Sequence, residues 1–330
     1  MAPTSSNQRT PSVWVRLLVL AGFAYAVVFA AALVDRSAFL PTGWLFDLAA
    51  QLTPFLVVGG LVLALGFLGT ARPGGAIIFG LIALVNLEHY ARPGPIAVAE
   101  SVFDPSADRV RLLSANIFQR SQALSNIAVA AKERDVDIIG IVEMPEADCS
   151  VLRQMFGSDW FCLIVDKDPR GVRLNRVSAL VARWEPSKVE VHHDQAFGGR
   201  AIIEARFSVG QESVNTIVLH PLPPGSPQYT DQRNAVLHHA AQLARGMPNS
   251  VVMGDFNTTP WARTYRTFHG KRASDPRFHS TWLTKWPFLG LPIDHIILDD
   301  ALLLGEMQVL SAVGSDHYPL FAEILLPADE

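Results

Sequence analysis

The chain has 330 residues, of which 49% are hydrophobic and 18% charged, and its formal net charge at pH 7 is −4. Five Lys and Arg residues precede residue 100, whereas residues 101–330 hold 22 basic and 27 acidic side chains. The net charge of −5 over these later residues disfavours a protein that binds duplex nucleic acid, because such proteins need an excess of Lys and Arg. The length allows about two domains.

Three apolar runs lie before residue 90, at residues 17–34, 48–71 and 73–87. The first two are long enough to cross a bilayer. The third is short, and it spans only if its polar flank, which includes Tyr90, lies among the headgroups. A cleaved signal peptide or a buried core helix is the alternative for any one run. We expect residues 1–100 to form an N-terminal membrane region with three transmembrane helices and a linker.

The basic residues beside these runs predict their orientation, because loops rich in Lys and Arg remain in the cytoplasm. The N-terminal tail carries Arg9 and Arg16 without an acid, and the turn before the third run carries Arg72. If all three runs cross, the following domain faces away from the cytoplasm. If the third does not cross, the domain is cytoplasmic. We expect three crossings and a multi-pass protein.

Residues 90–109 are typical of a linker, since they combine three prolines with mixed charge and no periodicity. We therefore place a domain boundary near residue 105 and expect residues 105–330 to form a second domain.

The second domain alternates apolar strands with amphipathic helices. Residues 136–143, VDIIGIVE, are almost wholly apolar, as expected of a strand covered on both faces. Apolar residues at helical spacing predict helices over 123–135 and 229–246. Two sheets packed face to face with helices outside would account for the pattern. Further strands are predicted at 109–117, 160–165, 176–183, 187–193, 201–209, 213–220, 250–257, 292–298 and 321–326.

Polar residues recur at or just beyond the ends of these strands. Taken singly, each has a structural explanation, such as a turn cap or an ion pair. Asp255 and Asn257 would point to the same side of an extended backbone, although an Asx turn is a competing explanation. Together the residues predict one pocket at one face of the sandwich. Its members are Asn116, Glu143, His220, Asp255, Asn257, Asp294, Asp316 and His317.

The composition of this set favours one kind of chemistry. Carboxylate and amide oxygens without nearby cysteines suit Mg²⁺ or Mn²⁺ better than structural zinc. Such a cation can polarise a phosphate, an Asp can orient the attacking water, and imidazoles can stabilise the developing charge. The set therefore predicts metal-assisted hydrolysis of a phosphoester or phosphoanhydride.

Six segments in chain order resemble the motif set of the endonuclease/exonuclease/phosphatase superfamily: SANI, GIVEM, LHPLPP, GDFNTTPW, PIDHIIL and GSDHYP. The resemblance covers roughly residues 109 to 327. It implies an α/β fold, namely a four-layered sandwich of two packed mixed sheets flanked by helices.

The resemblance also implies roles for individual residues. Asn116 and Glu143 lie where the family binds its divalent cation, with Glu143 as the principal ligand, and Asp316 would assist at the metal or support the network. Asp255 would position and deprotonate the nucleophilic water, and Asn257 would hold a phosphate oxygen.

The remaining implied roles belong to the imidazoles. His220 would contact the phosphate and help the leaving group. Asp294 would fix the tautomer of His317, and His317 would stabilise the transition state. His295 is expected to be a core residue without a role.

The apolar runs and the HPLPP segment further resemble a bacterial membrane-anchored subgroup that includes the teicoplanin-resistance (VanJ-type) proteins. This resemblance implies a phosphatase at the outer face of the bacterial cytoplasmic membrane. Its partners would be the lipid bilayer and a polyprenyl diphosphate such as undecaprenyl diphosphate. The alternatives are an extracytoplasmic metal-dependent nuclease, which the net charge disfavours, and a non-catalytic membrane scaffold or sensor.

Three further groups of residues receive structural interpretations. The two cysteines could pair in an oxidising compartment, but separate buried thiols are favoured. Three tryptophans could line a substrate groove, although core or rim positions are more typical. Four arginines could contact phosphate, although most of them are expected to be solvated surface charges. These groups are Cys149 and Cys162; Trp261, Trp282 and Trp286; and Arg170, Arg173, Arg176 and Arg200.

Overall fold

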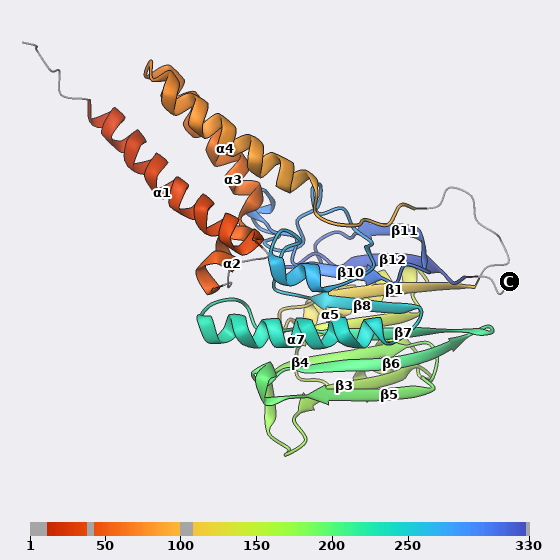
Figure 1. Cartoon of the computed structure of the whole chain (residues 1–330). Coiled ribbons are helices and arrows are strands. Elements are labelled where there is room, and N and C mark those ends of the chain that lie inside the picture. The colour runs from red at the N-terminus through yellow and green to blue at the C-terminus, as the bar shows by residue number, and fades with distance from the viewer. Residues whose placement is uncertain (1–11, 38–42, 100–107, 328–330) are drawn as a thin grey trace, which may run out of the picture. The chain divides into compact units, whose positions relative to one another are not determined.

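The structure, a computed structural model, describes residues 12–37, 43–99 and 108–327 (Figure 1). The chain divides into two compact units, Met1–Arg92 and Pro93–Glu330. We describe each unit by itself.

The first unit is helical. Its helices are α1 (Val13–Arg36), α2 (Trp44–Gln51), α3 (Thr53–Gly69) and α4 (Pro73–Ala91). Within the described residues, α1 and α4 are each long and apolar enough to cross a membrane, and the bent pair α2–α3 would make a third span. The predicted run 48–71 is therefore not one straight helix, because it bends by 71° between α2 and α3. Pro54 explains the break, since proline disfavours a helical residue before it and donates no backbone hydrogen bond.

The second unit contains two mixed sheets of six strands each, in the orders β11-β12-β1-β2-β4-β3 and β5-β6-β7-β8-β10-β9. The strands of the first are β1 (Arg109–Asn116), β2 (Ile138–Met144), β3 (Phe161–Lys167), β4 (Arg173–Ala182), β11 (Leu303–Val309) and β12 (Leu320–Leu325). Those of the second are β5 (Lys188–His193), β6 (Ala201–Val209), β7 (Glu212–Leu219), β8 (Ser250–Asp255), β9 (Lys271–Arg272) and β10 (Asp294–Leu298). The helices are α5 (Ser121–Glu133), α6 (Cys149–Phe156) and α7 (Pro227–Arg245), with short 3-10 turns at Gln195–Phe197, Arg263–Thr267 and Pro287–Leu289.

Alternation along the central strands builds the layers. In β2, Ile138 and Val142 belong to the core between the two sheets, whereas Ile139 and Ile141 pack in the core that includes α5 and α6. Strands β7 and β8 alternate in the same way between the central core and the core beneath α7. Figure 1 shows α7 running alongside its sheet. Because both faces of these strands are covered, they are almost wholly apolar, and the predicted four-layered sandwich is confirmed.

The connections bring several strand ends to one edge. Strands β1 and β2 are parallel and joined through α5, and β7 and β8 are parallel and joined through α7. Strand β10 runs antiparallel to β8, and β12 runs antiparallel to β1. The ends of β1, β2, β7 and β8 therefore share an edge with the starts of β10 and β12.

Helix α6 and strands β9 and β11 were not predicted, and part of the expected linker belongs to the second unit. Residues 93–99 of the expected linker pack on β9: Ala97 N donates to Arg272 O at 2.8 Å, and Arg272 Nη2 donates to Pro93 O at 3.0 Å. Strand β11 was not predicted. Most of its side chains are not buried, and its pairing with β12 is irregular between Leu304 and Glu306, so its sequence lacks the apolar pattern of a buried strand. Local periodicity could not indicate either segment, since partners distant in the sequence hold both.

We expect Gly254→Ala to destabilise the fold. Gly254 has φ 142°, and a Cβ there would lie 2.0 Å from Leu219 O in the neighbouring strand. An L side chain is strained at this φ, and the clash would force β7 and β8 apart, so we expect a loss of about 2 kcal/mol or more in unfolding free energy. Thermal unfolding of the purified variant measures it. Gly74→Ala is the control, because a Cβ there meets nothing within 4 Å, and equal stability of both variants would contradict the prediction.

Cys149 and Cys162 form a disulfide, so the preference for separate thiols was wrong. The physical reason is the turn between α6 and β3, which reverses the chain direction so that β3 runs back beside α6. The Cα atoms of Cys149 and Cys162 then lie 5.7 Å apart, within the range that a disulfide bridges. The sequence separation of 13 gave no indication of this approach.

Removing the disulfide in the double variant Cys149→Ser/Cys162→Ser should lower the unfolding free energy by about 3 kcal/mol, because the cross-link restricts a short loop of the unfolded chain. Denaturant titration of the full chain in detergent measures the loss. The wild-type protein under reducing conditions should match the variant. Identical midpoints for oxidised wild type and variant would show that the pair contributes no stability.

Candidate active site

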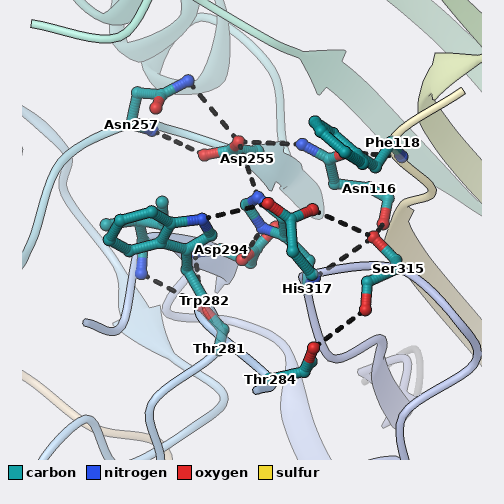
Figure 2. Close-up of polar contacts among 12 residues, drawn as sticks. Asn116, Phe118, Asp255, Asn257, Thr281, Trp282, Thr284, Asp294, Ser315 and His317 are labelled. Atoms are coloured by element: carbon teal, nitrogen blue, oxygen red, sulfur yellow. Dashed lines mark hydrogen bonds and ion pairs between the residues drawn. The ribbon is translucent and has the colours of Figure 1, made fainter. Parts of the chain in front are cut away.

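Asp255 lies at the centre of the polar edge (Figure 2). It ends β8 and is buried. Asn116 Nδ2, from the end of β1, donates to its Oδ2 at 3.0 Å, and the backbone N of Asn257 donates to its Oδ1 at 2.8 Å. The orientation of this carboxylate is therefore fixed from two sides.

Asp294 and His317 complete the centre. Asp294 is opposite Asp255 in the β8–β10 register, because it is the first residue of β10. His317 Nδ1 donates to Asp294 Oδ2 at 2.8 Å, and its Nε2 lies 3.9 Å from Asp255 Oδ2. All three side chains are buried. The carboxylate behind the imidazole holds the ring so that Nε2 faces Asp255.

Glu143 reaches the edge from an irregular position in β2. The β2–β4 pairing shifts register between Val142 and Met144, and Glu143 has φ 50°, in the left-handed region. Such bulges redirect a side chain next to active sites, and non-glycine residues at positive φ occur there at an energetic cost. Glu143 Oε1 lies 3.5 Å from His220 Nε2, which lies 3.6 Å from Asp255 Oδ2.

The buried charges shift one another's pKa values. Burial, reinforced by the charge of Asp294, raises the pKa of Asp255 to about 7. Burial opposes the charge of His317, but Asp294 and Asp255 outweigh it and raise the pKa of His317 to about 10. His220 is fully buried near Arg200, and both effects lower its pKa well below 6.5, so it is neutral. The site thus holds an imidazolium and a neutral imidazole beside three carboxyl groups, of which Asp255 titrates near neutral pH.

The site suits a divalent cation. Asp255 and Asp294 offer carboxylate oxygens that lie within 4.8 Å of each other and of a ring nitrogen of His317. Because His317 is protonated, it lies beside such an ion and is not one of its ligands. Glu143 Oε2 is buried, and its one close polar neighbour among the described residues is the Arg176 guanidinium, with which it forms an ion pair at 3.1 Å. Oxygen donors of this kind fit Mg²⁺ or Mn²⁺. Glu143 and Asp255, which face His220 together, are the residues we expect to hold such an ion, with Asn116 beside them.

Asn257 lies in a turn after β8, and not in the extended strand from which its position was predicted. Strand β8 ends at Asp255, and Asn257 has φ 49° in a turn closed by the Asp255 side chain. The competing Asx turn is therefore what forms, and the argument from an extended backbone was wrong. The turn nevertheless places the Asn257 amide next to Asp255, where Nδ2 donates to Pro221 O at 3.1 Å.

Asp316 lies at the rim. Its side chain is half-buried, and Trp282 Nε1 donates to Oδ2 at 3.4 Å. It is not among the ligand atoms of Asp255, Asp294 and His317 that lie within 4.8 Å of one another, so its place at the metal stays a prediction. Its charge helps Asp294 and Asp255 to raise the pKa of His317. Ser315 connects this segment to β1, because its Oγ donates to Asn116 O at 2.7 Å.

Two of the four arginines that could contact phosphate, Arg176 and Arg200, lie at the site. Arg176 Nε lies 3.1 Å from Glu143 Oε2. Arg200, which precedes β6, is buried, and its Nε and Nη1 have no hydrogen-bond partner among the described residues. Burial lowers the pKa of Arg200 to about 10 against the opposing charge of Glu143. The two glycines before Arg200 were the only local signal that could have indicated a special position.

Thr281 and Trp282 are site-supporting residues that sequence reasoning did not assign. Thr281 Oγ1 accepts hydrogen bonds from the backbone N of Ile293 at 3.0 Å and of Asp294 at 2.9 Å. Trp282 forms a β-bridge with His317. His295, predicted to be core, is fully buried and packs edge-on against Phe256 at 5.1 Å between ring centroids.

A family model described as the endonuclease/exonuclease/phosphatase family matches residues 113–317. No curated protein matches the chain.

Solved structures share the fold at low sequence identity. TDP2 from D. rerio, in complex with a single-strand DNA product, is 13% identical, with a TM-score of 0.53 over 66% of this chain and 98% of that one. An endonuclease/exonuclease/phosphatase from Beutenbergia cavernae is 17% identical, with a TM-score of 0.52 over 67% and 72%. The 3′-5′ exonuclease NExo from Neisseria meningitidis is 19% identical, with a TM-score of 0.50 over 64% and 98%.

Proposed function

The chain belongs to the endonuclease/exonuclease/phosphatase family, and from this membership and the geometry of its site we propose that it is a membrane-anchored, divalent-cation-dependent phosphohydrolase. The family is one of hydrolases that act on phosphoester bonds. The observation that carries the proposal is the convergence of Asp255, Asp294 and His317 within 4.8 Å, with Asn116 and Glu143 at their side.

Each side chain has a role consistent with its contacts. Asp255, raised in pKa to about 7 and held by Asn116 and Asn257, accepts the proton of the attacking water. His317, held by Asp294, donates to a non-bridging phosphate oxygen and stabilises the negative charge that accumulates there. A bound Mg²⁺ or Mn²⁺ would neutralise phosphate charge and polarise the phosphorus–oxygen bond.

The other basic groups suit the substrate phosphate. The guanidinium of Arg200 is buried and its Nε and Nη1 are not used by the described residues, so it can donate to a phosphate oxygen. His220 is neutral and can donate or accept one hydrogen bond, which suits the leaving-group oxygen.

The disulfide favours an extracytoplasmic location for the second unit, because such bonds persist in oxidising compartments. The apolar helices α1 and α4 would keep the unit at the membrane. We propose a bacterial cytoplasmic membrane protein whose hydrolase faces outward. A topology reporter fused after residue 330 tests the orientation.

A lipid-linked phosphate, such as a polyprenyl diphosphate, is the substrate class that we propose. A membrane tether raises the effective concentration of the enzyme at lipid headgroups. The acidic charge of residues 101–330 makes duplex DNA a less suitable substrate. Nuclease activity is the second candidate.

The test is hydrolysis by the purified full chain in detergent micelles, with Mg²⁺ or with EDTA. It is followed as phosphate release from the diphosphate and the nucleotide, as headgroup release from the phospholipid and as strand nicking of the DNA. Four substrates are compared: a polyprenyl diphosphate, a nucleotide, a phospholipid and plasmid DNA. We expect Mg²⁺-dependent release from the polyprenyl diphosphate and none with EDTA. Nicking of DNA that falls steeply with salt would favour the nuclease, and inactivity on all four would refute the hydrolase.

A further inference from the structure

Large apolar side chains are exposed close to the active site, on the segment between β9 and β10. Phe278, Trp286, Phe288 and Leu289 are 76%, 56%, 72% and 48% exposed. We name residues 277–290 the aromatic loop. From its chemistry and position we propose that the aromatic loop inserts into the surface of the lipid bilayer.

The aromatic loop has a defined conformation. Leu283 N and Thr284 N both donate to Asp316 O, at 2.9 and 3.0 Å. Within the loop, Leu289 N donates to Trp286 O at 2.9 Å, and Trp282 forms a β-bridge with Leu291, the residue that follows the loop. The exposure of the aromatic side chains is therefore imposed by a hydrogen-bonded turn.

The aromatic side chains are arranged to enter an apolar medium together. Residues 285–289 are all exposed and form one continuous stretch, which includes the 3-10 turn Pro287–Leu289. The Trp286 and Phe288 rings meet edge to face at 5.9 Å between centroids. Exposing large apolar groups to water is unfavourable, and a contiguous exposed set marks an interaction site.

The charges around these rings select a bilayer surface over other partners. Residues 276–292 contain Arg277 and Lys285 but no Asp or Glu, within a domain of net charge −5. Lys285 is exposed next to Trp286 and is the cation of the loop that can meet lipid phosphate. Arg277 lies 5.7 Å from the centroid of the Phe278 ring, but its guanidinium is paired with Asp275 at 2.6 Å. Tryptophan beside Lys or Arg is typical of segments that lie at the headgroup level, where the cation meets lipid phosphate.

The chain itself supplies a bilayer within reach. The helices α1 and α4 are long and apolar enough to cross a membrane. Pro93 and Ala97, which follow α4 closely in sequence, hydrogen-bond to Arg272 of β9, and the aromatic loop begins five residues after Arg272. The covalent tether thus enters the second unit at the strand that leads into the loop.

The same contacts connect membrane binding to the site. The loop is hydrogen-bonded to the backbone of Asp316, and Trp282 bridges His317. A bilayer held by Trp286 and Phe288 therefore lies against the rim of the catalytic pocket. The binding rests on the membrane anchoring in the proposed function but not on the hydrolase activity, whereas the consequence for catalysis rests on both.

The test measures lipid contact in the full chain, reconstituted at one copy per nanodisc with anionic phospholipid. Phe288→Cys introduces a single free thiol, because the described cysteines are paired, and this thiol carries an environment-sensitive fluorophore. Val189→Cys, at an exposed position on β5, is the matched control. Quenching is compared for phospholipid spin-labelled near the headgroup and for iodide in the water.

We expect the label at residue 288 to be quenched by spin-labelled lipid at least about twofold more than the label at residue 189, and to be protected from iodide. Equal quenching at both positions overturns the proposal. Protection from iodide without lipid quenching also overturns it, since that result means that protein covers the loop. The readout involves no hydrolysis, so an inactive enzyme would leave it unchanged.

Discussion

Asp255→Asn is expected to lower the rate of phosphate release by about 10³-fold or more, because an amide cannot accept the proton of the attacking water. The side chain is buried and is held by Asn116 at 3.0 Å and by the backbone of Asn257 at 2.8 Å. An isosteric amide keeps the volume of the side chain. The loss should therefore appear in kcat.

The same substitution should not weaken the fold. Burial and Asp294 raise the pKa of Asp255 to about 7, so its charged form is unfavourable in the folded protein without metal. Removing that charge should leave the melting temperature at pH 8 in EDTA unchanged or higher. Asp300→Asn, at an exposed position after β10, is the control and should retain full activity. Wild-type activity in Asp255→Asn would refute the role of this residue.

Glu143→Gln is expected to weaken the activation of the enzyme by Mg²⁺ by about 100-fold or more, since even residues that only orient a metal ligand are worth about 10- to 100-fold. The neutral amide keeps the shape of the side chain but loses the charge that faces His220. It also leaves Arg176, at 3.1 Å, without its carboxylate, which adds positive charge where a cation must bind. Titration of the rate with Mg²⁺ measures the shift.

Glu146→Gln is the matched control. Glu146 is on the surface three residues later and pairs with Arg173 at 2.6 Å. Exposed ion pairs contribute about 1 kcal/mol or less, so this variant should retain both stability and Mg²⁺ dependence. A Glu143→Gln enzyme with an unchanged Mg²⁺ profile would show that the cation binds elsewhere.

The strands that carry the site were predictable because their pattern is local. In β2 and β8 the apolar run itself indicates a strand buried on both faces, and the polar residue at its end, Glu143 or Asp255, marks where the core stops. The details of how these residues are presented were not predictable. The bulge at Glu143 and the turn at Asn257 depend on pairing partners that lie elsewhere in the chain.

The environment of single charged and aromatic residues was the least predictable feature. Arg200 looks like any surface arginine in the sequence, yet it is buried. Trp286 looks like a core or rim tryptophan, yet it is exposed on a turn that Asp316 holds in place. Cys149 and Cys162 meet only because α6 and β3 lie together. Burial is decided by neighbours that are distant along the chain.

The sequence by itself determined the apolar helices, most strands of the sandwich and the eight polar residues at the ends of those strands. These features are predictable because hydrophobic periodicity and the end of a strand each depend on a few neighbouring residues. Only the tertiary structure decided which of the eight side chains lie together. Asp294 and His317 lie within 4.8 Å of Asp255, whereas Asp316 lies at the rim. Distances between side chains depend on sheet order and register, which no short stretch of sequence contains.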